Sequence, residues 1–355
     1  MYNSKVPGYI GLVFCILITC LWASWGVIEM FHEGWYAPFE FLLFLVPMFF
    51  FLLLSLVAIS WPKIGGWLLI SLGLVFFVLI NVKNFNHPDW SVGTILSWIP
   101  TTLFLCVIGM LFLLDAKARR SYKAIYLSNC NWFTRQFRYI LATALPIILA
   151  IGFSIEPAVR VASRIDDGNY GERQIEGNGV SLVWAPEGPG WVNTVYGRTW
   201  NELALYGKPP IGFEGKRYGP NYDGTPESIE YASDEDFAQY NMFRYLSKDG
   251  LHLEDTVQDY WRLPTTDELV RSMMRHGKNC GGKWNGKIGN QDYKVLPDKE
   301  TPLWNPKRPA IYYWTADSFD STRAYYVTYN GVVRVADKTA YMGSRGYRAV
   351  RTSTK

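Results

Sequence analysis

Long apolar runs alternate with short polar segments up to Pro157, and no comparable run follows it. Five windows, at about 8–30, 38–60, 64–82, 95–114 and 138–156, each supply the roughly 20 apolar residues that a helix needs to cross a bilayer. The first window is too long for the apolar core of a secretion signal, and four more windows follow it. The pattern predicts a multi-pass α-helical membrane domain with five transmembrane helices over residues 1–157.

The distribution of basic residues predicts how these helices are oriented. The only dense basic segment of this half lies between the fourth and fifth windows and contains Lys117, Arg119, Arg120, Lys123, Arg135 and Arg138. Loops rich in Lys and Arg face the cytoplasm. Alternating outward from this loop places the N-terminus in the cytoplasm and delivers everything after the fifth window to the outer side. We therefore expect a bacterial cytoplasmic (inner) membrane protein with a periplasmic or extracellular C-terminal domain.

The apolar windows carry charge only at their boundaries, at Glu29, Glu40, Asp115, Arg138 and Glu156. Transporters and channels place ionisable groups at membrane depth, because ion or proton coupling needs them. Pro47, Pro100 and Pro146 would kink helices without forming a transport path. The membrane half therefore reads as an anchor or an assembly surface in contact with the lipid bilayer.

The C-terminal half has the composition of a folded extramembrane domain. Residues 158–178 are polar and read as a linker, of which part would pack as an edge element, and residues 179–355 form the domain. One helix is expected over 234–248, stopped by Asp249-Gly250, and a second from Thr265 or Thr266 to Gly277. Strands are expected at 311–316, 324–329, 332–336 and 347–351, with Asn330-Gly331 as a hairpin turn between the second and third. Helices and strands in this arrangement predict an α+β domain.

Four segments resemble the landmark motifs of a known bacterial domain family. They are WRLPTTDEL at 261–269, YYWTAD at 312–317, AYYVTYNGVV at 324–333 and GYRAVR at 346–351. The family includes the C-terminal domain of a collagen-like bacterial adhesin and is similar in fold to the formylglycine-generating enzyme, also called sulfatase-modifying factor, and to C-type lectins. The resemblance covers about 235–351. It implies a C-type-lectin-like, formylglycine-generating-enzyme-like domain.

The residues of these motifs read mainly as structural. Trp261, Leu263 and Pro264 would bury beside the second helix, and Arg262 would hydrogen-bond carbonyls or Glu268 across the turn. Tyr313 and Trp314 alternate along a strand, so that one of the two sides is core. The remaining motif residues are Gly331, which the hairpin requires, Gly346 in the last motif, and Arg348 and Arg351 on a half-buried strand.

The enzymatic relatives imply chemistries that this domain is poorly equipped to perform. Formylglycine-generating enzymes resemble copper-dependent oxidases with paired cysteines, and this domain has only Cys280. The sulfoxide-forming relatives bind iron through several histidines, and this domain has only His252 and His276, the latter placed at a helix C-terminus. We predict no catalytic residue and no metal ligand, with a metal-dependent oxidase as the weaker alternative. Basic and acidic residues nearly balance, which argues against nucleic acid as a partner.

A binding surface is the remaining expectation. Residues 158–355 carry 17 Tyr and 7 Trp, side chains that anchor both protein partners and sugars. The residues expected to make surface contacts are Trp284, Tyr293, Asp317, Asp320, Arg323, Tyr341 and Arg345. Calcium is kept as an alternative cofactor on the acidic groups Asp166-Asp167, Asp234-Glu235-Asp236, Asp317 and Asp320.

The sequence thus predicts a non-catalytic binding module. A single helix would be enough to tether a domain, so five helices favour an accessory or assembly subunit that packs against other membrane-protein subunits. The alternatives are a glycan-binding receptor or adhesin, the oxidase, and a sensor that signals through the 115–138 loop.

Overall fold

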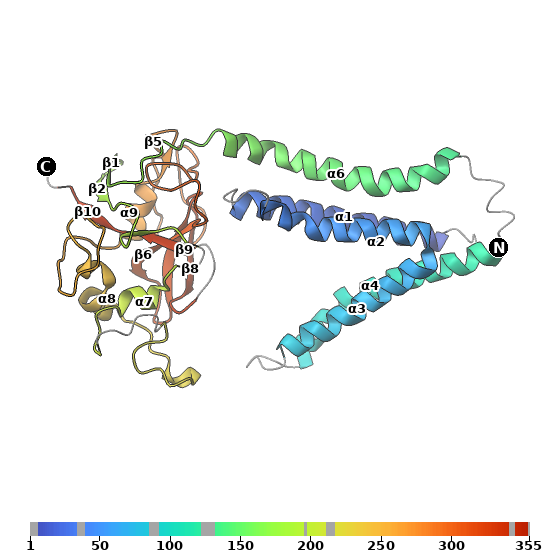
Figure 1. Cartoon of the computed structure of the whole chain (residues 1–355), viewed down its shortest axis with the longest axis horizontal. Helices are drawn as coiled ribbons and strands as arrows, with labels where there is room; N and C mark the ends of the chain where they lie inside the picture. The colour runs from blue at the N-terminus through green and yellow to red at the C-terminus, as the bar shows by residue number, and fades with distance from the viewer. Residues whose placement is uncertain are drawn as a thin grey trace. The chain divides into compact units, whose positions relative to one another are not determined.

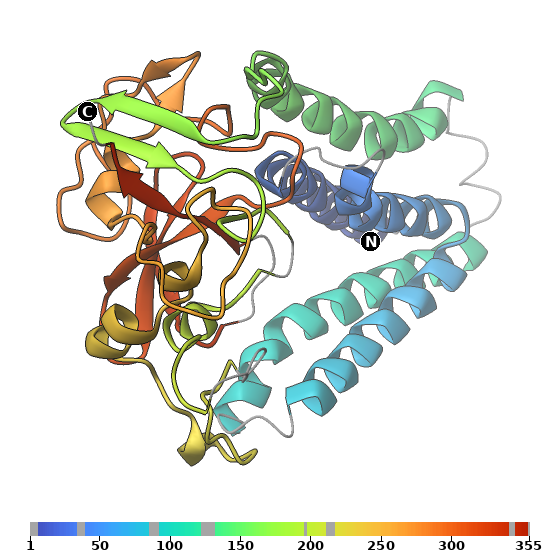
Figure 2. The ribbon, with the colours of Figure 1, turned by 60° about the vertical axis from the view of Figure 1, so that its left-hand side comes forward.

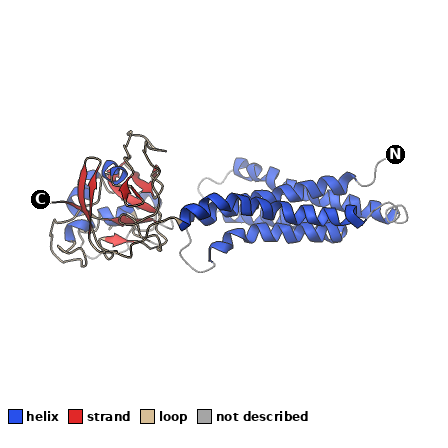
Figure 3. Ribbon diagram, turned by 90° about the horizontal axis from the view of Figure 1, so that it is seen from above, coloured by secondary structure: helices blue, strands red, loops and turns tan. Residues whose placement is uncertain are grey.

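The structure is a computed structural model that describes residues 6–33, 40–84, 92–121, 132–194, 197–210, 217–340 and 345–353. The chain divides into two compact units, the first ending at Val159 and the second beginning at Arg160. The first unit is helical, and the second contains all the described strands (Figure 1, Figure 3).

The first unit consists of α1 (Val6–Glu33), the 3-10 turn η1 (Glu40–Leu45), α2 (Val46–Ser60), α3 (Pro62–Asn84), α4 (Val92–Ser121) and most of α6 (Trp132–Ala162). Among the described residues, five stretches are long and apolar enough to cross a membrane: Val6–His32, Leu42–Ser60, Pro62–Val82, Ile99–Arg120 and Gln136–Ala162. The prediction of five such helices is therefore confirmed. The fifth continues beyond the expected end at residue 156, because Pro157 is accommodated inside α6.

Small residues bring α3 and α4 into close contact. A Cβ atom added to Gly66 would lie 2.7 Å from the Gly109 carbonyl oxygen, and one added to Gly109 would lie 2.5 Å from the Gly66 carbonyl oxygen. Six residues beyond Gly109, Asp115 is buried against Gly8 of α1 and forms a 2.8 Å ion pair with Arg119. Helices in a membrane commonly approach through such small residues, because lipid supplies no hydrophobic drive for their association.

The second unit is built on three sheets. The three-stranded sheet has the order β1 (Arg173–Gly177), β2 (Val180–Trp184), β10 (Val350–Thr352). The five-stranded sheet has the order β3 (Trp191–Val192), β9 (Arg345–Arg348), β6 (Tyr312–Ser318), β7 (Arg323–Thr328), β8 (Val333–Asp337), and only β6 and β9 are parallel. Figure 2 shows the green hairpin β1–β2 with β10 beside it. The third sheet is the hairpin of β4 (Met274–Arg275) and β5 (Lys278–Asn279).

Short helices pack around the sheets, namely α7 (Trp200–Ala204), η2 (Pro226–Ser228), α8 (Asp234–Tyr240), η3 (Met242–Tyr245) and α9 (Thr266–Arg271). Three of them begin with a reciprocal capping box, in which a Ser or Thr side chain and an acidic side chain three residues later satisfy each other's backbone N–H groups. In α9 the pair is Thr265 and Glu268.

The five-stranded sheet is covered on both faces. Trp314 packs in one apolar cluster with Trp200 and Phe243, whereas its neighbour Tyr313 packs in another with Trp184 and Leu269. Successive side chains of a strand point to opposite faces, so both faces of β6 are core. The expectation that only one side of this strand is core is therefore wrong.

Three predicted elements differ in the structure. The helix expected over 234–248 ends at Tyr240, because Asn241 adopts an extended conformation with ψ of 149° and a separate 3-10 turn follows. The helix expected to reach Gly277 ends at Arg271; His276 and Gly277, with φ of 50° and 71°, form the turn of the β4–β5 hairpin. The strand expected over 347–351 is divided at Ala349 between two sheets.

Much of the segment expected to be a linker, 158–178, is ordered against the domain. β1 pairs with β2 from Arg173 to Gly177, and the Ile165 carbonyl accepts a 3.2 Å hydrogen bond from the Thr301 N–H. The part of 158–178 that packs as an edge element is thus a full strand of the three-stranded sheet.

Candidate binding surface

A group of aromatic side chains lies partly exposed on β7, on the turn between β6 and β7, and on the loop before β6. The ring centroid of Tyr325 lies 5.6 Å from that of Trp284 and 5.4 Å from that of Phe319, and both pairs of rings are nearly perpendicular. The Arg323 guanidinium lies 4.6 Å over the Phe319 ring. We call these four residues (Trp284, Phe319, Arg323 and Tyr325) the aromatic surface. Phe319 keeps 39% of its surface exposed, so part of this ring is open to a partner.

Asp320 holds the turn that presents this surface. Its carboxylate accepts hydrogen bonds from the Arg323 side chain at 2.7 Å and from the backbone N–H groups of Thr322 and Arg323 at 2.9 and 2.7 Å. These contacts, led by the one from the Arg323 side chain, hold the pKa of Asp320 far below its usual range. The carboxylate therefore remains charged and fixes Arg323 in the orientation that covers Phe319.

Asp317 is close in sequence to the aromatic surface, but its carboxylate binds the first turn of α9. It accepts a 2.6 Å hydrogen bond from the Thr266 N–H, one of the donors that the start of a helix leaves unsatisfied. Nearby, the Thr266 and Thr315 hydroxyls share a 2.9 Å hydrogen bond. Asp317 thus connects β6 to α9.

Tyr293, predicted as a surface contact, lies half-buried over the hairpin turn. Its hydroxyl donates to the Gly331 carbonyl at 3.1 Å, and a Cβ atom added to Gly331 would lie 2.5 Å from its ring. Burial raises the pKa of Tyr293. Gly331, at φ of 82°, is required both by the turn and by this ring. The predicted contacts Tyr341 and the side chain of Arg345 lie outside the described residues.

The WRLPTTDEL motif forms the junction between α9 and the core. Trp261 is buried and donates from its indole to the Ser247 carbonyl at 2.9 Å, and Leu263 and Pro264 are buried beside it. Arg262 donates to both carboxylate oxygens of Glu268 at 2.7 and 2.6 Å, the hydrogen bond expected across the turn. This contact, together with the Thr265 N–H, keeps the pKa of Glu268 below its usual value against the opposing effect of burial.

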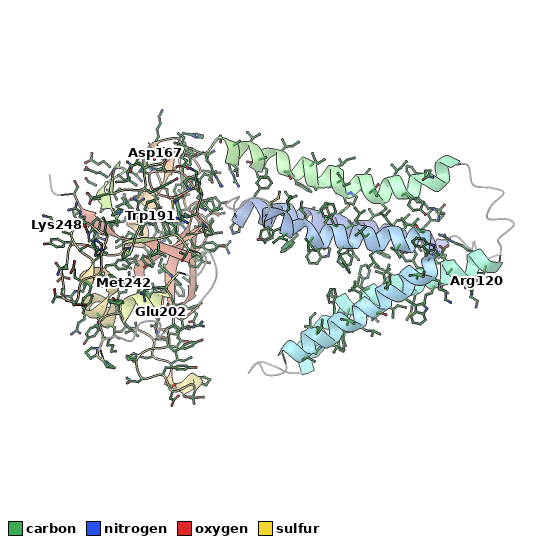
Figure 4. The ribbon with its side chains drawn as sticks, in the orientation of Figure 1. Arg120, Asp167, Trp191, Glu202, Met242 and Lys248 are labelled. Carbon is green, nitrogen blue, oxygen red and sulfur yellow. The ribbon has the colours of Figure 1, made fainter. Side chains whose placement is uncertain are left out.

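Arg348 is fully buried, where a half-buried position was expected. Its guanidinium donates to the carbonyls of Ala185 at 2.8 Å and Leu303 at 3.0 Å and lies 3.5 Å over the Trp191 ring. Burial lowers the pKa of Arg348 to about 9. Gly346 two residues earlier allows β9 to approach β3, since an added Cβ would lie 2.1 Å from the Val192 carbonyl oxygen. Both residues organise the fold and are not surface contacts. Figure 4 labels Trp191 within this domain.

A separate open hollow of about 440 Å³ is lined by Glu172, Ser247, Lys248, Asp249 and Arg351. Arg351 donates to both oxygens of Glu172 at 2.8 and 2.9 Å and lies 5.1 Å over the Trp261 ring. The Ser247 hydroxyl donates to Asp249 at 2.6 Å, which lowers the pKa of that carboxyl group. We call this region the polar hollow. Its two carboxylates and two cations, close to an indole, suit a polar ligand with several hydrogen-bonding groups.

The described side chains do not form a recognisable metal site. Among them, no group of three His, Cys, Asp or Glu residues lies close enough together to bind one metal ion. His252 is exposed, and His276 stands in the β4–β5 turn with its ring 3.5 Å from Glu300, instead of at a helix C-terminus as predicted. Burial raises the pKa of Cys280 to about 12, so that its thiol stays protonated at neutral pH.

Among the acidic residues considered for calcium, Asp166, Asp167 and Asp236 have protein partners, as do Asp317 and Asp320 described above. Asp166 accepts from Tyr170 at 2.8 Å and pairs with Lys307, and Asp167 pairs with Arg173. Asp236 caps α8 and pairs with Lys208 at 2.9 Å. These contacts satisfy carboxylate oxygens that calcium would otherwise coordinate.

Two features were missed in the sequence. Phe319 was not singled out, although a lone aromatic residue in the predicted 317–323 loop is a signal for a contact residue. The second is a buried ionic cluster around Asp298, whose members come from segments far apart in the chain and leave no local pattern.

Comparison with known sequences matches one family model to part of the chain. It is described as a domain of unknown function (DUF7670) and matches residues 2–125. This range contains the first four candidate spans, whereas Gln136–Ala162 and the second unit lie beyond it. No curated protein and no solved structure matches the chain.

Proposed function

We propose that this protein is a non-catalytic binding subunit, anchored by five membrane helices, whose aromatic surface recognises a protein partner on the outer side of a bacterial cytoplasmic membrane. The observation that carries the proposal is the partly exposed ladder of Trp284, Tyr325 and Phe319 capped by Arg323. Tryptophan, tyrosine and arginine are the residues that most often dominate binding energy at protein interfaces. A rigid aromatic anchor also loses little conformational entropy on binding.

The orientation rests on charge. The basic residues Lys117, Arg119 and Arg120 end α4, and the single span of α6 lies between that end and the extramembrane domain. A cytoplasmic position for the basic end places the domain on the opposite, outer side. The large number of spans supports a subunit that packs laterally against other membrane proteins, since one helix is enough for tethering.

The fold proposed for the domain is that of the C-type-lectin-like and formylglycine-generating-enzyme-like proteins. Its support is that the four motifs behind the resemblance occupy the centre of the second unit. WRLPTTDEL forms the entry to α9, and the later motifs cover most of β6, β7 and β9.

Native mass spectrometry of the full chain, extracted from its own cells in a mild detergent, tests the proposed function. The wild-type protein is expected to co-migrate with a partner subunit at fixed stoichiometry, and Phe319→Ala to lose that subunit. Lys248→Ala is the matched control: it removes an exposed side chain from the polar hollow and should leave the partner subunit bound. A wild-type particle that is monomeric and without a partner would overturn the proposal.

A glycan is the second candidate ligand, and the polar hollow favours it. Two carboxylates, two cations and a serine hydroxyl around an open volume can satisfy the hydroxyl groups of a sugar. This receptor function predicts that the full chain in detergent binds a glycan array, with and without calcium, and that Lys248→Ala weakens binding while Phe319→Ala does not. The oxidase alternative is the least supported, because Cys280 is buried and the two histidines of the domain lie apart from each other.

A further inference from the structure

The first unit contains a hollow of about 450 Å³ between the start of α3 and the end of α4. Its described lining consists of Lys63, Trp67, Leu113, Ala116, Lys117 and Arg120, without a carboxylate among them. Three cations, one indole ring and two aliphatic side chains thus line one cavity. We call it the basic hollow. Figure 4 labels Arg120 near the end of α4.

The packing of α3 against α4 builds this hollow. The Gly66–Gly109 contact holds the two helices together, and α4 continues for three turns beyond it to Ser121. Leu113, Lys117 and Arg120 follow one another at helical spacing and therefore lie on one side of α4. Lys63 and Trp67 are likewise four residues apart, in the first turns of α3. Apolar and cationic side chains thus line the hollow from both helices.

The nearest buried acid is directed elsewhere. Asp115 is 1% exposed, packs against Gly8 of α1 and pairs with Arg119. Arg119 also donates to the Ile59 carbonyl of α2 at 3.3 Å, so this pair connects α4 with α1 and α2. Its negative charge is committed within the helix bundle and does not line the basic hollow.

We propose that the basic hollow binds the phosphate-bearing headgroup of an anionic membrane lipid. It lies where the apolar stretch Pro62–Val82 begins and the apolar stretch Ile99–Arg120 ends. For a helix that crosses a membrane, this is the level of the lipid headgroups. Lysine and arginine in pockets between transmembrane helices recognise anionic headgroups, and tryptophan is enriched at the same level. The inference rests on the membrane location in the proposed function but not on the protein partner.

The test uses the purified full chain in a neutral detergent, supplied with phosphatidylglycerol or with phosphatidylcholine of the same acyl chains. Phosphatidylglycerol is expected to raise the thermal unfolding midpoint and to remain bound in native mass spectra, whereas phosphatidylcholine does neither. The double variant Lys63→Gln, Arg120→Gln should weaken phosphatidylglycerol binding by about 30-fold, taking about 1 kcal/mol per cation. Lys63→Arg, which keeps the charge, should bind as the wild type does and shows that the position tolerates substitution.

Arg138→Gln is the matched control. Arg138 lies near the start of α6, on the same membrane side as the end of α4 by chain connectivity, and its guanidinium stacks 4.2 Å over Tyr9 outside the hollow. An equal loss of binding in this variant would show general charge attraction and overturn the proposed site, as would equal binding of the two lipids. Stabilisation by inorganic phosphate that competes with the lipid would overturn the lipid assignment. None of these outcomes affects the partner test at Phe319.

Discussion

Arg164 and Asp298 form a buried ion pair, in which the guanidinium donates to a single carboxylate oxygen at 2.7 and 3.0 Å. The other carboxylate oxygen accepts from Arg275 at 2.8 Å and lies 3.7 Å from Arg160. The Asp298 side chain is only 1% exposed. One carboxylate therefore holds the end of α6 and the residues that follow it against the loop before β6.

Replacing Asp298 by Asn should destabilise the second unit by about 3–5 kcal/mol, because Arg164 and Arg160 would lose their counter-charge, whereas Arg275 keeps its pair with Glu300. Denaturant unfolding of the full chain, followed by tryptophan fluorescence, measures this change. The control is Asp259→Asn, which breaks the exposed pair with Arg244 at a residue whose φ of 56° Asn tolerates. The control should cost at most about 1 kcal/mol. Equal effects of the two substitutions would show that the Asp298 cluster does not stabilise the fold.

Gly331→Ala should destabilise the β7–β8 hairpin by about 2–3 kcal/mol. The substitution adds strain at a φ of 82° and drives a Cβ atom to within 2.5 Å of the Tyr293 ring. Gly224→Ala is the matched control, since its φ is 102° but an added Cβ meets nothing within 4 Å, so it carries only the backbone strain. Combining Gly331→Ala with Tyr293→Ala should cost less than the sum of the two single changes in unfolding free energy. Strict additivity would show that ring and turn are independent.

Cys280 should react slowly with iodoacetamide in the folded protein. Burial raises its pKa to about 12 from 9.0, so the reactive thiolate is scarce at neutral pH. Because the folded pKa is above the unfolded one, the neutral thiol contributes stability that is fully present below pH 9 and is lost as the pH rises towards 12. Mass spectrometry of the peptide that contains Cys280 separates its labelling from that of the other cysteines. Labelling as fast as in the denatured protein would contradict the burial.

The proposed orientation predicts that reporters at the two sides of the fifth span behave oppositely. Alkaline phosphatase fused after Thr352 should be active, because it folds only outside the cytoplasm, and a fluorescent protein fused there should remain dark. A fusion truncated after Ser121, at the end of α4, should give the reverse pattern. The opposite result at both points would invert the topology and place the aromatic surface in the cytoplasm.

Local chemistry accounts for what could be predicted from the sequence. Apolar runs predict the five long helices because a span needs little more than length and hydropathy. The capping pair of Thr265 and Glu268 and the Asn330-Gly331 turn lie within a few residues of their partners, so their positions follow from short motifs. The end of α9 could not be predicted, because the β4–β5 hairpin, with its turn at Gly277, competes with the helix for the same residues.

The features that could not be predicted depend on contacts between residues far apart in the sequence. Arg348 donates to the Ala185 and Leu303 carbonyls, 163 and 45 residues away, and no local pattern distinguishes it from a half-buried strand residue. The division of the segment 347–351 at Ala349 likewise depends on pairing with β2 and β3, which lie more than 150 residues earlier in the sequence. At the candidate surface, Trp284 and Arg323 were each predicted alone. Their connection through Tyr325 and Phe319 depends on the segment that carries Trp284 lying against β7, and no local pattern indicates that contact.

The most direct test of the central claim is site-specific photo-crosslinking at the aromatic surface in intact membranes. A benzoyl-phenylalanine placed at Phe319 replaces one exposed aromatic ring by another, and the same group at Leu251, 44% exposed beside the polar hollow, serves as the control. We predict that irradiation joins position 319 to one protein of defined mass, that Arg323→Ala abolishes this product, and that position 251 does not form it. Absence of a protein product from position 319, or the same product from both positions, would contradict the account.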